Sequence, residues 1–218
     1  MGAVGGLFVV LAADVPDYSS LIREDEEGTI ERLKANRHQL VDPKIGEHGG
    51  RIVRANAGSL LIQFADPTAA VQCAVELQRG LIERNAGAAP ERRIAFRIGI
   101  ASGDATPRDD LVLRAVAALP ADQLARLIKP GRESRADPGT LATRVAALAE
   151  PGGICISEAV RKAIRDRPYT FADIGKHEIN TGHRRSAVMQ WAQHQWHRSL
   201  ARSPRAQRAG ATPASVGG

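Results

Sequence analysis

The sequence predicts an α+β sandwich in which helices pack on a mixed β-sheet. Short apolar runs typical of strands recur along the chain, and segments with helical periodicity separate them. Two of these runs, 51–54 and 60–64, are close enough to form a hairpin, and the last two strands, 169–174 and 186–191, are consecutive. The order is strand, helix, hairpin, helix, strand, helix, strand, helix and two strands, which suits this fold class.

The N-terminal part supplies one strand and one long helix. Residues 7–13 form an apolar run, which we interpret as a strand rather than a signal peptide because no Lys or Arg precedes it. Segment 26–45 places its apolar residues near one helical face. Pro43 should kink or restart this helix, with Asp42 as a candidate cap.

The hairpin turns at residues 56–59, Asn-Ala-Gly-Ser, where Gly58 can be the glycine that a tight turn favours. Asp66 and Pro67 then form a strong helix start, an N-cap followed by proline at the first helical position. This helix should end near Asn85. Strand 94–100 follows, with apolar residues at every second position.

The C-terminal half is predicted from shorter signals. Residues 111–138 suggest two short helices and a polar loop, and 140–150 carries the next helical stripe. Residues 154–156 form a short strand, and Ser157 should cap a helix that extends to about Ile164.

The 218 residues suit one domain, 1–197, followed by a basic tail, 198–218. The tail carries much of the net charge of +6, with four arginines and no acid. Because it has few apolar residues, we expect it to be disordered, and the domain without it is close to neutral. We therefore do not expect nucleic-acid binding.

No apolar segment is long enough to predict a membrane span. Cys73 and Cys155 are far apart and lie in apolar surroundings, outside any metal-binding pattern. They are most simply buried thiols in a reducing compartment, so we expect a cytoplasmic protein.

Three stretches resemble one known family: AADVPDYS at 12–19, residues 25–53, and ALAEPGGICIS at 147–157. They are similar to the catalytic domain of class III nucleotidyl cyclases, the adenylate and guanylate cyclases, especially bacterial single-domain adenylate cyclases. The similarity runs from about residue 7 to 191, with 111–138 as an atypical insertion. It implies a ferredoxin-like α/β sandwich that works as a homodimer, or as a heterodimer with another cyclase domain, with active sites at the interface.

The resemblance also implies the chemistry. The ribose 3′ oxygen of ATP attacks the α-phosphorus and expels pyrophosphate, and Mg²⁺ or Mn²⁺ ions activate the nucleophile and offset phosphate charge. Asp14 matches the first metal-binding aspartate, with the Val15 carbonyl as a further ligand. The second aspartate of the family falls at Gly58, which has no carboxylate.

At the other positions that matter in the family, this sequence matches only in part. Arg54 stands where a lysine helps to select adenine, and Asp110 would be the acid that binds the purine edge. Arg144 matches the arginine that stabilises charge on the phosphates at the transition state, with Thr140 in place of an asparagine four residues earlier.

The loop after the first strand also differs from the family pattern. Family members bind the triphosphate there through backbone N–H groups. Pro16 removes one such donor, and Asp17 adds negative charge nearby.

These departures favour a cyclase-like domain in cyclic-nucleotide signalling that is catalytically impaired and acts as a dimerising or regulatory module. An active adenylate cyclase, with Asp17 or another acid replacing the lost ligand, is the alternative. A basic-tailed binding protein is a third hypothesis. Asp14 could equally cap the following helix, and Arg144 could form a surface salt bridge.

Overall fold

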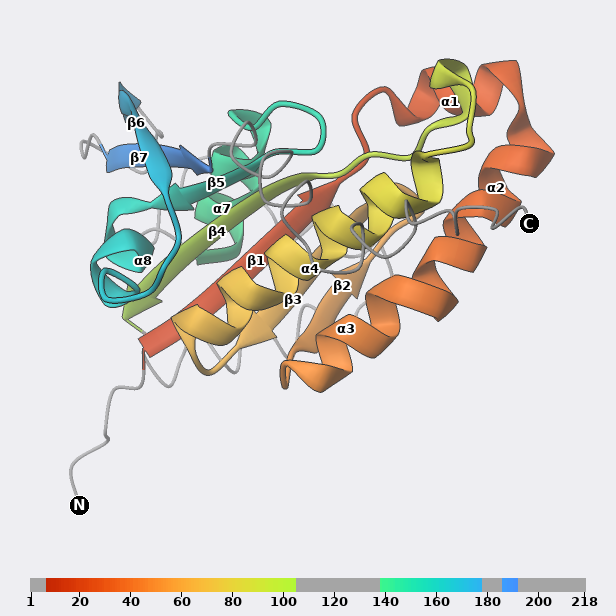
Figure 1. Cartoon of the computed structure of the whole chain (residues 1–218). Coiled ribbons are helices and arrows are strands. Elements are labelled where there is room, and N and C mark those ends of the chain that lie inside the picture. The colour runs from red at the N-terminus through yellow and green to blue at the C-terminus, as the bar shows by residue number, and fades with distance from the viewer. Residues whose placement is uncertain (1–6, 105–137, 178–185, 192–218) are drawn as a thin grey trace, which may run out of the picture.

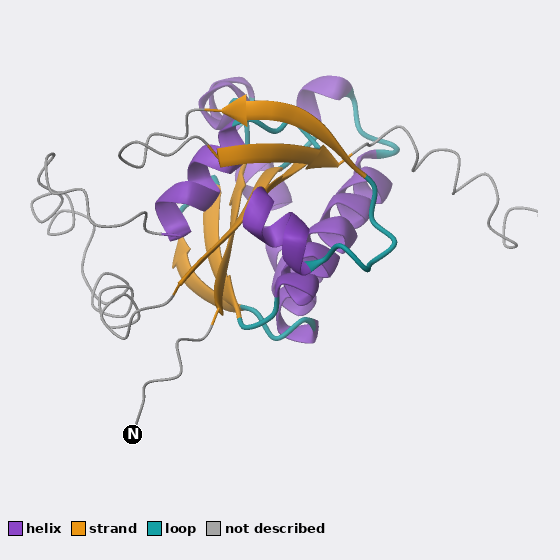
Figure 2. Cartoon of the chain, turned by 90° about the vertical axis from the view of Figure 1, so that its left-hand side faces the viewer, coloured by secondary structure: helices purple, strands orange, loops and turns teal. Residues whose placement is uncertain are grey.

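The computed structural model describes residues 7–104, 138–177 and 186–191. They form one seven-stranded sheet in the order β2-β3-β1-β4-β5-β7-β6, with helices packed on both faces (Figures 1 and 2). Strands β4 and β5 are parallel, and the other neighbouring pairs are antiparallel. The predicted α+β sandwich with a mixed, mostly antiparallel sheet is confirmed.

The strands are β1 Leu7–Asp14, β2 Arg51–Ala55, β3 Ser59–Phe64, β4 Arg97–Asp104, β5 Ile154–Ser157, β6 Phe171–His177 and β7 Ser186–Trp191. The helices are α1 Tyr18–Glu24, α2 Glu26–Asn36, the π-helix η1 Arg37–Val41, α3 Asp42–Glu47, α4 Pro67–Asn85, the 3₁₀-helix η2 Pro90–Arg92, α7 Pro138–Ala147 and α8 Glu158–Ala163. Asp110, the tail and all but the last residue of segment 111–138 lie outside the described residues.

The alternation of β1 divides the core between the two faces of the sheet. Val9, Leu11 and Ala13 join the larger apolar cluster, to which α4 also contributes. Val10 and Ala12 face the opposite way and pack with residues of α7 in a smaller cluster. Strand β1 therefore lies between two apolar clusters, one on each face of the sheet.

Two predicted caps are confirmed. The carboxylate of Asp66 accepts hydrogen bonds from the backbone N–H groups of Thr68 and Ala69, at 3.2 and 3.1 Å, and α4 begins at Pro67. The Ser157 hydroxyl accepts from the Val160 N–H at 3.5 Å at the start of α8.

The predicted cap at Asp42 is wrong. The chain stays helical through a π-turn, in which the Asp42 N–H bonds to the carbonyl of Arg37, five residues back. The Asp42 carboxylate accepts from the Arg37 Nε instead of capping α3. Because Pro43 lacks an N–H and crowds the preceding turn, the wider π-turn accommodates it without a break.

Strand β4 begins at Arg97, three residues later than predicted. The side chain of Asn85 binds both backbone groups of Ile94, with its Nδ2 2.8 Å from the carbonyl and its Oδ1 3.2 Å from the N–H. Pairing with β1 begins only where Arg97 meets Asp14. Side chains of α4 therefore bind the backbone at Ile94 and Phe96 in place of strand pairing.

In the part of the chain that the structure describes, no helix combines the length and the apolar character needed to span a membrane.

Candidate active site

Asp14 ends β1 at the centre of the site. The register of the sheet places it between Ser59 of β3 and Arg97 of β4. Arg97 Nη2 donates to Asp14 Oδ2 at 2.6 Å, and the two side chains are 30% and 40% exposed. Asp14 therefore does not cap α1; its carboxylate is bound to a cation from the neighbouring strand.

The hairpin tip lies beside the end of β1. The Asn56 N–H donates to the Ser59 carbonyl at 2.8 Å, and the reverse bond measures 3.4 Å, so Ala57 and Gly58 form a two-residue turn as predicted. The Val15 N–H donates to the Gly58 carbonyl at 2.8 Å. The structure thus brings together three of the sequence-predicted positions, Asp14, Val15 and Gly58.

The turn itself does not require glycine at position 58. Neither Ala57 nor Gly58 has a positive φ, so any residue could adopt this backbone. A Cβ on Gly58 would lie 3.0 Å from Cγ and 3.1 Å from Cδ2 of Tyr18. Close packing of the Tyr18 side chain, rather than turn conformation, is the feature that suits glycine here.

The loop between β1 and α1 is irregular. Asp17 has φ 56 and ψ 26, a left-handed conformation that aspartate tolerates better than most residues. Its carbonyl accepts from the N–H groups of Ser20 and Leu21, and its exposed side chain makes no capping bond to α1. The left-handed turn at Asp17 is thus what directs the chain from β1 into α1.

Helix α7 carries Thr140 and Arg144 on its exposed side. Ala142 and Ala146 pack on the sheet, and α7 approaches β4 so closely that a Cβ on Gly99 would overlap the Ala142 carbonyl oxygen and the Ala146 nitrogen. This contact fixes α7 on the same side of the sheet as Asp14. Thr140 and Arg144 therefore point away from the sheet of their own chain.

Arg54 lies on the edge strand β2. A β-bulge after Ile52 places Arg54 opposite Leu61, which belongs to the small cluster on the α7 face. Arg54 is exposed on that face, two strands from Asp14. The predicted partner of Arg54, Asp110, lies outside the described residues.

Arg97 is the site residue that sequence reasoning missed. In the sequence, Arg97 is a single basic residue within a predicted strand whose apolar residues alternate. Only the pairing of β4 with β1 shows that it meets Asp14. Among the described residues, its Nε is buried and has no hydrogen-bond partner, so one donor of the guanidinium is unused there.

The described residues do not fit a pair of catalytic metal ions. Mg²⁺ and Mn²⁺ prefer several carboxylate or carbonyl oxygens. The end of β1 offers the Asp14 carboxylate and the Val15 carbonyl, whereas the hairpin turn offers no acid. Across the described parts of the chain, no group of three or more His, Cys, Asp or Glu side chains could hold a metal ion.

Comparison with known proteins agrees with this architecture, although no family model matches the sequence. Over 187 residues, 85% of the chain, it is 28% identical to "Putative adenylate cyclase 3" of Rhizobium meliloti, and it spans 28% of that protein's length. It is 31% identical to the adenylate/guanylate cyclase/hydrolase of Silicibacter pomeroyi, with a TM-score of 0.67, covering 85% of this chain and 96% of that one.

The adenylyl cyclase CyaB of P. aeruginosa has the same fold, with a TM-score of 0.62 at 19% identity over 86% of this chain and 94% of that one. The chain therefore belongs to the class III adenylate/guanylate cyclase family.

Proposed function

We propose that this chain is a cyclase-like domain of cyclic-nucleotide signalling whose own catalytic site is impaired, and that it acts as a dimerising or regulatory module. The observation that supports this most directly is the ion pair at the C-terminal end of β1. Asp14 is the carboxylate that remains there, and it is bound to Arg97 at 2.6 Å.

The hairpin adds a second reason. Gly58 contributes a carbonyl bonded to the Val15 N–H and no side chain, so a second carboxylate is missing at the family position. Two metal ions beside a triphosphate need carboxylate ligands from the protein in addition to the phosphate oxygens. A lone carboxylate that already neutralises an arginine is poorly suited to that task.

The exposed position of Thr140 and Arg144 supports the partnering part of the proposal. Both lie on the solvent side of α7, so a second cyclase domain could be reached by the Arg144 guanidinium. We propose a homodimer or a heterodimer with a complete cyclase domain. Thr140 lacks the amide of asparagine, so this chain would offer the partner an incomplete set of groups.

The alternative is an active adenylate cyclase that converts ATP into cyclic AMP and pyrophosphate with Mg²⁺ or Mn²⁺. The exposed Asp17 carboxylate favours it, because it makes no capping bond and lies three residues after Asp14. In that case Asp17→Asn and Asp14→Ala would each abolish product formation.

An end-point cyclisation assay distinguishes the two functions. Purified full chain is incubated with ATP or GTP and excess Mn²⁺, and cyclic product is detected by mass spectrometry, with Asp14→Ala as background. We expect no product above that background. Cyclic AMP from the wild-type chain that disappears in Asp14→Ala would overturn the proposal in favour of the alternative.

A variant that carries the family residues at positions 58 and 140 makes the assay a stronger test. Gly58→Asp with Thr140→Asn returns the missing carboxylate and amide, and Tyr18 need move by only a few tenths of an ångström to admit the new Cβ. We expect this variant to form cyclic product. Ala57→Asp with Thr140→Asn is the matched control, since it adds the same charge one residue from the required position and should stay inactive.

A further inference from the structure

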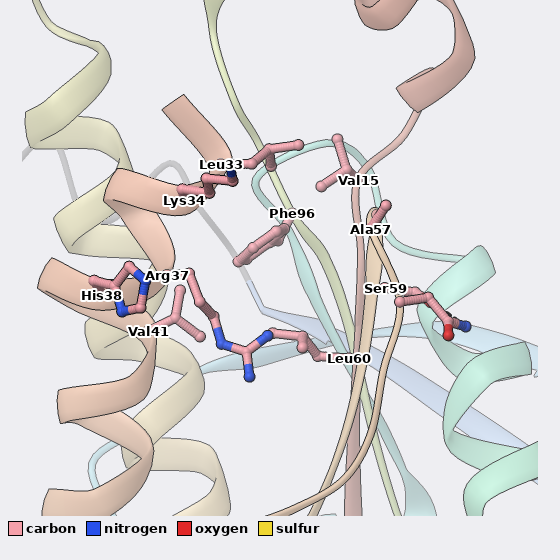
Figure 3. A pocket seen from close by; sticks show the side chains of 12 residues that line it. Val15, Leu33, Lys34, Arg37, His38, Val41, Ala57, Ser59, Leu60 and Phe96 are labelled. Carbon is pink, nitrogen blue, oxygen red and sulfur yellow. Dashed lines mark hydrogen bonds between the residues drawn. The ribbon is translucent and has the colours of Figure 1, made fainter. Parts of the chain in front are cut away.

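An open cavity of about 210 Å³ lies on the face of the sheet opposite Asp14. Figure 3 shows it between the α2–η1 helix on one side and the ends of the strands on the other. Its apolar walls come from Val15, Leu33, Val41, Leu60 and Phe96. Of the residues that the structure describes, no acidic one lines it.

Three basic side chains line the helical side of the cavity. Lys34, Arg37 and His38 are placed there by the junction of α2 with the π-helix. The Arg37 guanidinium lies between Val41 and Leu60 in Figure 3, and its Nε donates to Asp42. π-turns within helices occur frequently at functional sites, and this one widens the helix where Arg37 faces the strands.

The size of the cavity limits what it can hold. At roughly 30 Å³ for each water, its volume accommodates about seven water molecules. Pockets for drug-sized ligands measure about 300–1,000 Å³, so this cavity suits a smaller molecule. The apolar walls favour a short hydrocarbon or aromatic body, and the basic residues favour an anionic head.

We propose that this cavity binds a small amphipathic anion, with its apolar body against Phe96 and Leu33 and its carboxylate or phosphate head at Lys34, Arg37 and His38. The cavity borders the candidate active site, because Val15 and Gly58 line it, but its occupation requires no catalytic activity of the chain.

The cavity also adjoins the C-terminal end of β1, where Asp14 lies. Val15 and Phe96 line it, and each is the chain neighbour of one member of the Asp14–Arg97 pair. Val15 and Phe96 belong to the larger apolar cluster, on the face of the sheet opposite to Asp14 and Arg97. A bound anion would therefore contact Val15 and Phe96, the chain neighbours of Asp14 and Arg97, on the opposite face of the sheet.

Chemical-shift titration of the ¹⁵N-labelled full chain tests the proposal without measuring turnover. Hexanoate and hexyl phosphate are added separately, and the backbone signals of Val15 and Gly58 are followed. We expect saturable shifts with at least one of them, and the comparison identifies the preferred head group. Absence of saturable shifts with both would overturn the proposal.

Two neutral or truncated probes test the two halves of the ligand. Hexan-1-ol lacks the anionic head and acetate lacks the apolar body, so both should bind at least about fivefold more weakly than hexanoate. Equal affinity for hexan-1-ol and hexanoate would show that the basic residues do not recognise the anionic head group, and would contradict the proposal.

Lys34→Gln with His38→Gln tests the basic residues, which are exposed and therefore tolerant of substitution. We expect hexanoate affinity to fall about tenfold, in line with the loss of charge-assisted hydrogen bonds. Lys162→Gln on α8 is the matched control, because that lysine is 74% exposed, does not line the cavity, and should leave affinity unchanged. An unchanged affinity in the double variant would contradict the proposed head-group site.

Discussion

The Arg97 guanidinium lies 2.6 Å from the Asp14 carboxylate, and the two residues are direct partners in the β1–β4 register. Each side chain is partly exposed, so the pair is accessible to solvent and to ions. A metal ion and Arg97 would compete for the same oxygen atoms. The Asp14 carboxylate is thus paired with a cation from its own chain.

Replacing Arg97 should therefore strengthen Mn²⁺ binding at Asp14. Partly exposed ion pairs contribute about 0.2–1 kcal/mol, so Arg97→Gln should raise Mn²⁺ affinity by no more than about fivefold. Water-proton relaxation enhancement measures the affinity without nucleotide. Arg97→Gln with Asp14→Asn should lose the gain; if the double variant kept it, the ion would be binding elsewhere.

Gly99 should be essential for the position of α7. A Cβ at this residue would overlap backbone atoms of Ala142 and Ala146, which cannot rotate away as a side chain can. We expect Gly99→Ala to lower the free energy of unfolding by roughly 1–3 kcal/mol in urea titrations. Gly87→Ala is the control, because a Cβ there meets nothing within 4 Å and should change stability by less than about 0.5 kcal/mol.

Glu76 should make stability depend on acid pH. Lys44, whose Nζ lies 3.0 Å from the Glu76 carboxylate, lowers the pKa of Glu76 below its ordinary value of 4.5, against the opposing effect of burial. The His48 ring, 3.3 Å from the same carboxylate, acts in the same direction as Lys44. The carboxylate therefore stabilises the fold above about pH 4.5, and that contribution is lost as the pH falls further.

Urea unfolding at pH 7 and pH 3.5 measures this effect. The side chain is 36% exposed, so we expect a difference below about 1 kcal/mol between wild type and Glu76→Gln at pH 7, and less at pH 3.5. Glu83→Gln, an exposed position on the same helix, should show no such pH dependence. An equal effect of Glu76→Gln at both pH values would contradict the assignment.

Both cysteine thiols should be unreactive in the folded protein. Cys73 and Cys155 are fully buried, and burial raises the pKa to about 12 for Cys73 and to about 11 for Cys155. Because thiolate is the reactive form, neither should react with a thiol-specific chromogenic reagent at pH 8 until the protein is unfolded in urea. Rapid reaction of either thiol in native protein would show local opening of α4 or β5.

The sequence by itself determined most of the strands and helices, and its resemblance to known cyclases predicted the family. The Asp66–Pro67 helix start, the alternation in β1 and the turn at residues 56–59 are local signals, because capping, strand alternation and turn formation involve residues close together in the chain. The missing carboxylate at Gly58 could also be read from sequence, since it depends on residue identity alone.

The tertiary structure decided which side chains meet. That Arg97 binds Asp14, that Tyr18 packs on Gly58, and that basic residues of α2 and η1 enclose a cavity with Phe96 all depend on contacts between segments far apart in the chain. The late start of β4 has the same origin, because Asn85 competes for the backbone of Ile94. Such contacts depend on strand register and helix docking, which the residue pattern within one segment does not specify.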